Sequence, residues 1–415
     1  TRYWRDWSSD VCSSDLMCKP CEREHVNEHD AVVKEAWEKV CSLEFGGRGW
    51  EQAQLPLRMG GLAVGTTAPR SAAAYLTAWT RTQGEVLRRV DAPNMRALRQ
   101  RDAGLNGELT AAAHSLQQWG VPREDIPFEE GGPGARPVKQ KALVEQVNKA
   151  RRNLLLEGMD DGLKGRVRSA SGPGAGAFLT LPTQQDHNVE NDLFRAAVAK
   201  RLGGSIAPKQ QGPNPICCLL SREGRCSQVL DPNGVHGVQC KCGGFVNRRH
   251  DRVAKFLAGW LQDGRCDSDV LLEQVVPGNA VDDEGADRLD VTFEADGRRV
   301  WIDVAIVAVQ TNNLRERVRR AQKDGVAARA EEAHKRARYR GLATPFVLEA
   351  SGRPGDSARA FIGQYAVDKG NSVSMDAAAA WQSISAIVQG DTADLELRAN
   401  GWGPAERAKA PLAIP

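Results

Sequence analysis

The chain has 415 residues, of which 26% are charged, and its formal net charge is +3. This length allows two or three domains, and no apolar run approaches the roughly 20 residues that span a bilayer, which excludes a membrane-spanning helix. Ten cysteines without a secretory signal at the start predict reduced thiols or bound metal and therefore an intracellular protein.

Residues 1–16 are unlike the rest of the chain. Arg5–Leu16, RDWSSDVCSSDL, is what a common sequencing-adapter string spells in one reading frame. We therefore interpret residues 1–16 as an assembly artefact and exclude them from fold prediction. We also expect that a segment which normally precedes Met17 is missing.

Helices dominate the pattern up to residue 212. The predicted helical stretches are Cys18–Leu43, Ser71–Val90, Gly104–Trp119, Val138–Leu163 and Asn191–Leu202. Gly131–Gly134 has the composition of a linker. These features predict a helical segment over 17–130 and a helical linker region over 131–212, before a cysteine-rich segment over 213–247.

From Arg248 the elements follow the order α-β-β-β-α-β, which predicts an α/β domain with a mixed sheet over 248–375. They are a helix at Arg248–Gly264, a strand at Asp269–Val276, a hairpin at Arg288–Val307, a helix at Thr311–Arg340 with Gly325 as a candidate break, and a strand at Thr344–Ala350. In the last segment, 376–415, we predict a helix at Asp376–Val388 and a loose tail after Gly401.

The hairpin contains the most informative pattern of the chain. Asp296-Gly297 is a strong turn signal. The register that it sets pairs Ala295 with Arg298, Phe293 with Val300, Val291 with Ile302, and Leu289 with Val304, which makes one face apolar. On the other face Asp290 lies opposite Asp303. Like charges at that spacing destabilise a sheet unless something compensates them, and a divalent cation would do so.

Three carboxylates could converge on such a cation, Glu273 from the first strand and the hairpin pair Asp290 and Asp303. Phosphodiester hydrolysis uses Mg²⁺ or Mn²⁺ to neutralise developing charge and to lower the pKa of the attacking water. Lys335 is our candidate for a nearby cation that orients the water or the phosphate. The alternatives are two solvent-facing strand aspartates and an ordinary charged helix face around Lys335.

One long run resembles the restriction-like endonuclease of non-LTR retrotransposons, a member of the PD-(D/E)xK nuclease group. The matching residues are His236–Cys240, the triplet Arg249-His250-Asp251, Glu273, Arg288–Asp290, Asp303–Val307, Lys335, Tyr339 and Pro345–Glu349. The resemblance implies metal-binding roles for Asp290 and Asp303, a supporting role for Glu273, and a catalytic lysine. Because Ala305 stands where many relatives carry that lysine, Lys335 on the next helix takes the role.

The cysteine-rich segment predicts structural zinc, which prefers four Cys or His ligands in a tetrahedron. The candidate ligands are Cys217, Cys218, Cys226, His236, Cys240 and Cys242. The related elements carry a Cys-Cys-His-Cys knuckle here, so we choose Cys218, Cys226, His236 and Cys240, with Cys217 and Cys242 as substitutes. A reduced, cysteine-rich loop is the alternative. A second pattern, Cys18, Cys21, His25 and His29, is interpreted as ordinary helical positions.

Two upstream stretches, Leu55–Trp79 and Ser171–Thr183, resemble segments that follow the reverse transcriptase in the same elements. The resemblance implies the C-terminal part of a retrotransposon polyprotein that nicks target DNA and, when intact, binds the element's RNA, in the nucleus if the host is eukaryotic. We predict DNA backbone contacts from Arg248, Arg249 and His250, supported by the basic stretch Arg315–Arg340. The alternatives are a catalytically dead, zinc-stabilised nucleic-acid-binding remnant and a repair or junction-resolving nuclease. Oligomeric state is left open.

Overall fold

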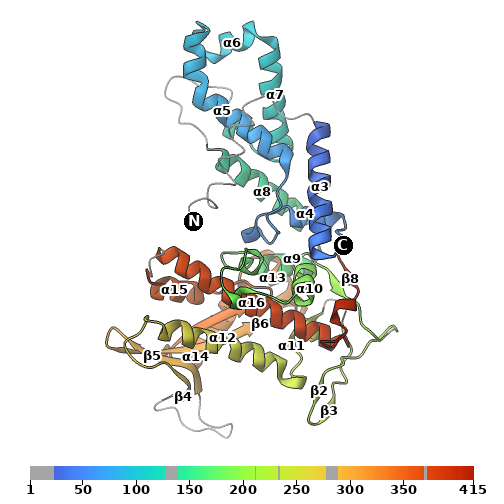
Figure 1. Cartoon of the computed structure of the whole chain (residues 1–415), viewed down its shortest axis with the longest axis vertical. Helices are drawn as coiled ribbons and strands as arrows, with labels where there is room; N and C mark the ends of the chain where they lie inside the picture. The colour runs from blue at the N-terminus through green and yellow to red at the C-terminus, as the bar shows by residue number, and fades with distance from the viewer. Residues whose placement is uncertain (1–22, 127–138, 211, 232–233, 277–287, 369–371) are drawn as a thin grey trace. The chain divides into compact units, whose positions relative to one another are not determined.

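The computed structural model describes residues 23–126, 139–210, 212–231, 234–276, 288–368 and 372–415. The chain divides into unit 1, Thr1–Trp37 with Val64–Gly158, and unit 2, Glu38–Ala63 with Met159–Pro415 (Figure 1). These units do not follow the bounds of the predicted segments. Glu38–Ala63, from the first predicted helical segment, belongs to unit 2 together with Met159–Pro415. Residues 1–16, which we interpret as an adapter sequence, lie outside the described residues.

Unit 1 is helical. Its helices are α3 (Arg23–Cys41, which continues into unit 2), α5 (Thr67–Arg89), α6 (Met95–Arg101), α7 (Ala103–Gln118) and α8 (Gln140–Glu157). They enclose a core that includes Leu76, Leu109 and Leu143. The side chains of Asn94 and Asp102 cap α6 and α7 by accepting backbone N–H hydrogen bonds in the first turn. The predicted helices Cys18–Leu43, Ser71–Val90 and Gly104–Trp119 are confirmed with shifts at their ends, whereas the predicted helix Val138–Leu163 ends at Glu157 and another helix begins at Asp161.

Unit 2 contains the predicted mixed sheet. Its four strands are β4 (Leu271–Val275), β5 (Arg288–Ala295), β6 (Arg298–Val307) and β7 (Ala343–Glu349), adjacent in that order. The first three are antiparallel, and β7 is parallel to β6. Helices α13 (Leu314–Gln322) and α14 (Val326–Arg338) connect β6 to β7 and meet at Gly325, whose φ of 69° only glycine adopts readily. The predicted order α-β-β-β-α-β is confirmed.

Different helices cover the two faces of this sheet. On one face α12 (Phe245–Gln262), α15 (Asp356–Tyr365) and α16 (Val373–Ala399) pack against Val291, Ile302 and Phe346. On the other face α14 lies against β6 and β7, and Tyr339 at its end packs with Trp301. The two central strands that carry the aspartates are therefore within reach of α12 from one side and of α14 from the other.

Helix α16 is longer than the predicted Asp376–Val388. Nearly every residue of its C-terminal half is buried, because α10 (Asn191–Arg201), α11 (Val235–Gln239) and α12 pack around it (Figure 1). The stretch after Val388 carries Asp391, Asp394 and Glu396, which are buried although such charged residues usually mark an exposed segment. The remaining helices of unit 2 are α4 (Gly47–Ala53) and α9 (Asp161–Ser169), and the short 3₁₀ turns are Leu57–Met59, Arg123–Asp125 (in unit 1), Ala177–Leu179, Gln185–His187, Cys242–Gly244 and Arg407–Lys409.

The prediction of a loose tail after Gly401 is wrong. Strand β8 (Leu412–Ala413) pairs with β1 (Ser205–Ile206), and Ile414 bridges to Phe45. The composition of the tail did not reveal this pairing because its partners lie far away in the sequence. None of the helices in the described ranges combines the length and the apolar character that crossing a membrane requires.

Two stretches singled out in the sequence, Leu55–Trp79 and Ser171–Thr183, contact a buried arginine. Arg201 is 3% exposed, and its guanidinium donates hydrogen bonds to the carbonyl oxygens of Leu57, Gly61 and Ala175. Burial lowers the pKa of Arg201 to about 9, and the neighbouring Arg166 adds to the effect. Backbone carbonyl oxygens of both stretches thus accept hydrogen bonds from the charged guanidinium of Arg201 in the interior of unit 2.

Candidate functional site

Asp303 of β6 and Lys335 of α14 form a close ion pair. Lys335 Nζ lies 2.6 Å from Asp303 Oδ2, and both side chains are largely buried. Burial raises the pKa of the Asp303 carboxyl above its usual range. Lys335 acts against this shift, and the negative charge of Asp290 adds to it. The structure thus brings together three of the four predicted catalytic residues, Asp290, Asp303 and Lys335.

Asp290 is held by contacts from two other elements. Its Oδ2 accepts a hydrogen bond from the Val304 backbone N–H at 2.6 Å and lies 3.2 Å from His250 Nε2 of α12. His250 Nδ1 lies 3.0 Å from Asp251 Oδ1. Burial of the imidazole opposes its protonation, but the carboxylates of Asp290 and Asp251 outweigh burial and raise the pKa of His250 to about 9. His250, predicted as a DNA contact, therefore lies at the carboxylate pair.

The contact between Asp290 and Val304 marks the end of the regular hairpin. The predicted register is confirmed from Ala295–Arg298 to Val291–Ile302. Beyond this point a carboxylate oxygen takes the Val304 N–H that a strand partner would otherwise receive. Leu289, expected on the apolar face opposite Val304, packs instead with Trp301 and Tyr339. That part of the prediction is wrong because the ladder is interrupted at Asp290.

Glu273 lies on the edge strand across from Asp290. The neighbouring pairs Leu272–Val291 and Gln274–Leu289 place it there, but its φ of 55° is left-handed and its side chain is exposed. Side chains other than glycine rarely adopt this conformation. The structure thus places Glu273 beside the pair in the sheet without burying its carboxylate there, and its supporting role stays a prediction.

The carboxylate pair fits a hard divalent cation. Two adjacent aspartates offer the oxygen ligands that Mg²⁺ and Mn²⁺ prefer. The contacts to Val304, His250 and Lys335 use Oδ2 of each aspartate, which leaves the Oδ1 atoms as candidate ligands. Burial and the negative charge of Asp290 both raise the pKa of Asp303. A bound cation would favour the charged form of this carboxylate.

Cys217, Cys226, His236 and Cys240 form a second candidate metal site, with ligand atoms within 4.8 Å of one another. Sγ of Cys240 lies 3.8 Å from Sγ of Cys217 and 3.7 Å from Sγ of Cys226. Two thiolates on one tetrahedral zinc, with Zn–S near 2.3 Å, would be about 3.8 Å apart. Cys226 Sγ lies 3.3 Å from His236 Nε2. These atoms have the spacing of a zinc tetrahedron.

Cys217 takes the place in this cluster that we predicted for Cys218, so that choice is wrong. Adjacent residues of an extended segment point to opposite sides. Cys217 is buried against Cys240, whereas Cys218 Sγ accepts a hydrogen bond from Arg225 Nη2 at 2.8 Å. Of the N-terminal pattern, Cys18 and Cys21 lie outside the described residues, and His25 and His29 are positions of α3.

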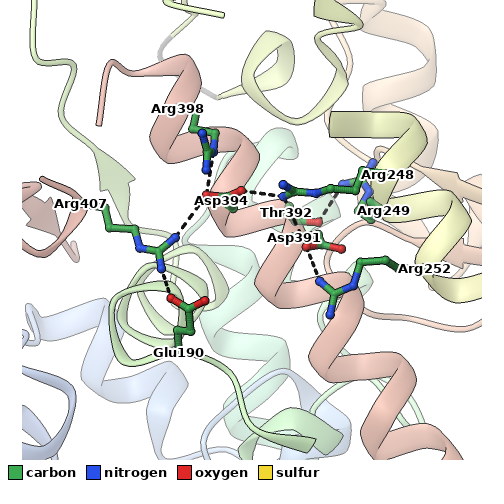
Figure 2. Close-up of polar contacts among 9 residues, drawn as sticks. All are labelled: Glu190, Arg248, Arg249, Arg252, Asp391, Thr392, Asp394, Arg398 and Arg407. Carbon is green, nitrogen blue, oxygen red and sulfur yellow. Dashed lines mark hydrogen bonds and ion pairs between the residues drawn. The ribbon is translucent and has the colours of Figure 1, made fainter. Parts of the chain in front are cut away.

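Two of the three predicted DNA contacts, Arg248 and Arg249, lie against α16. Arg248 contacts Asp391 and Asp394, and Arg252 contacts Asp391 (Figure 2). Arg249 is 2% exposed and donates a hydrogen bond to Thr392 Oγ1 at 2.7 Å. The prediction of a DNA contact for Arg249 is therefore wrong, because its guanidinium anchors α12 to α16. The side chain of Arg248 is 43% exposed, so its DNA contact stays a prediction.

The same cluster of arginines and aspartates links the C-terminal tail to α16 through Arg407. Asp394 also contacts Arg398 and Arg407, and Arg407 contacts Glu190 (Figure 2). Sequence reasoning missed this cluster because its members come from four separate segments.

No protein-family model matches the chain, and no curated protein matches it. A functional conclusion therefore depends on the two candidate metal sites.

Proposed function

We propose that this chain is the endonuclease portion of a non-LTR retrotransposon polyprotein and that it nicks DNA with Mg²⁺ or Mn²⁺. The observation that carries the proposal is the ion pair between Lys335 and Asp303, with the carboxylate of Asp290 beside it. Two carboxylates on a mixed sheet, with a lysine on the helix beside them, are groups that metal-dependent phosphodiester hydrolysis can use. The resemblance described above supplies the substrate class.

Each residue of the site has a distinct role in this proposal. Asp290 and Asp303 would hold the cation, which supplies a water of lowered pKa and neutralises charge on the phosphate. Lys335 holds Asp303 in place and presents an ammonium group that orients the water or a phosphate oxygen. The Cys₃His cluster would hold a structural zinc that fixes the segment before α12. The exposed guanidinium of Arg248 would contact the DNA backbone.

The test is a nicking assay on supercoiled plasmid with the full, zinc-loaded chain. Reactions contain Mg²⁺, Mn²⁺ or no added divalent cation, so that no chelator disturbs the zinc. We expect metal-dependent nicking that is lost in Asp303→Ala and retained in Glu294→Ala, an exposed carboxylate on the same hairpin. DNA binding should persist in both variants.

A catalytically dead nucleic-acid-binding remnant is the second candidate. The exposed side chain of Glu273 favours it, because only two of the three predicted carboxylates are in contact. Folded, zinc-loaded wild-type protein that binds DNA equally well with and without Mg²⁺, and never nicks it, would contradict the nuclease and support the remnant.

A further inference from the structure

His250 contacts the same oxygen of Asp290 as a backbone N–H of the sheet. Val304 N lies 2.6 Å from Asp290 Oδ2, and His250 Nε2 lies 3.2 Å from that atom. An ionised carboxylate only accepts hydrogen bonds, so both groups donate to it. Oδ2 is thereby fixed from two directions, and rotation of the carboxylate would break both hydrogen bonds.

The imidazole is itself held on both sides. Asp251 Oδ1 lies 3.0 Å from Nδ1, and the neighbouring Arg249 is anchored to Thr392 of α16. Val253, one turn further along α12, is fully buried in the core beneath the sheet. The ring therefore reaches Asp290 from a rigid element, with 28% of its side chain exposed.

From this geometry we infer that His250 is a positioning residue that fixes the rotation of the Asp290 carboxylate and so presents Oδ1 to the cation. The inference rests on the proposed function, since it assigns a ligand atom of the same site. It replaces the DNA-contact role that the sequence suggested. Groups that orient metal ligands in this way commonly change metal affinity about 10- to 100-fold when they are removed.

Two conservative substitutions separate this role from others. The side-chain amide of glutamine in His250→Gln can reach the position of Nε2 and still donate to Asp290. The shorter amide in His250→Asn reaches only the position of Nδ1, next to Asp251. A positioning role is kept by glutamine and lost by asparagine and alanine. A phosphate contact or a proton-transfer role does not follow that order.

The experiment measures Mn²⁺ affinity of the full, zinc-loaded chain by calorimetry, without DNA, together with the melting temperature and the affinity for a DNA duplex in the absence of Mn²⁺. Asp290→Asn identifies the Mn²⁺ that binds at the carboxylate pair. His334→Ala, an exposed histidine of α14, is the control. We expect His250→Ala and His250→Asn to weaken Mn²⁺ binding about 10- to 100-fold and His250→Gln to stay near wild type, with DNA affinity unchanged.

Three results would overturn the inference. His250→Gln could be as impaired as His250→Ala, all three variants could bind Mn²⁺ as wild type does, or all three could lose DNA affinity alone. Failure of the proposed function is visible earlier and separately: wild type would then bind no Mn²⁺ that Asp290→Asn removes. That result would overturn the nuclease and the positioning role together.

Discussion

Lys335 Nζ lies 2.6 Å from Asp303 Oδ2, although 32 positions separate the two residues in the chain. The pair joins α14 to β6 on one face of the sheet, while His250 reaches Asp290 from α12 on the other face. Two carboxylates at the end of one hairpin thus each receive a cationic group from a different helix. These two groups offset part of the negative charge, but the pKa of Asp303 stays raised, and the lysine lies where phosphate chemistry would use it.

Replacing Lys335 should slow nicking more than it weakens DNA binding. Lys335→Met removes one group that stabilises charge in the transition state, and such losses lower the rate about 10²- to 10³-fold. Single-turnover nicking measures the rate, and fluorescence anisotropy measures DNA affinity. His334→Ala on the same helix should change neither quantity. Circular dichroism of Lys335→Met shows whether loss of fold explains its rate, and Lys335→Arg keeps a cation beside Asp303. A wild-type rate in Lys335→Met would contradict the assignment.

Adjacent cysteines should differ in their effect on bound zinc. Cys217 belongs to the Cys₃His cluster, whereas Cys218 pairs with Arg225. Elemental analysis of purified protein should find close to one zinc per chain in wild type and in Cys218→Ser, and clearly less in Cys217→Ser. The reverse order would restore Cys218 as the ligand. Equal zinc in all three proteins would show that Cys242 or another group replaces Cys217.

The acidic cluster of α16 should stabilise unit 2. Asp394 is 4% exposed and contacts Arg248, Arg398 and Arg407. Asp394→Asn leaves these guanidinium groups without their shared charge, so we expect the free energy of unfolding to fall by about 3 kcal/mol.

Urea unfolding followed by circular dichroism measures this loss. Glu294→Gln, which breaks an exposed pair with Arg299 in the same unit, is the control, and we expect it to cost less than about 1 kcal/mol. Equal small effects from both variants would show that the cluster does not stabilise the fold.

Unit 1 should lose stability in alkali through Tyr75. Burial and then the hydrogen bond to Glu108 raise the pKa of Tyr75 to about 12, above its usual value near 10. A group whose pKa is higher in the folded state contributes stability that is complete below the unfolded pKa, so this contribution should decline from about pH 10 to about pH 12. Urea unfolding at several pH values between about 9 and 12 measures this decline. Tyr75→Phe should show a flatter dependence on pH, and an unchanged slope would exclude Tyr75 as the cause.

The local pattern of the sequence determined the elements and the hairpin. Asp296-Gly297 and the alternation around it were sufficient to predict the pairing of Val291 with Ile302, because turn chemistry and a period of two act within a few residues. The same pattern singled out Asp290 and Asp303, since two like charges in adjacent register need compensation. Lys335 was a candidate as a cation on the helix that follows the hairpin, and the resemblance supported that choice.

Only the tertiary structure decided which groups meet. It placed Lys335 against Asp303 and His250 against Asp290, and it buried Arg249 against Thr392. It put Cys217, in place of the predicted Cys218, in the Cys₃His cluster. It also paired the tail with β1, which composition had suggested was loose. These outcomes depend on how distant segments pack and on the direction of individual side chains. Local propensity and spacing carry no information about either, so the sequence identified the reactive residue types while the packing of α12 and α14 against the sheet selected their partners.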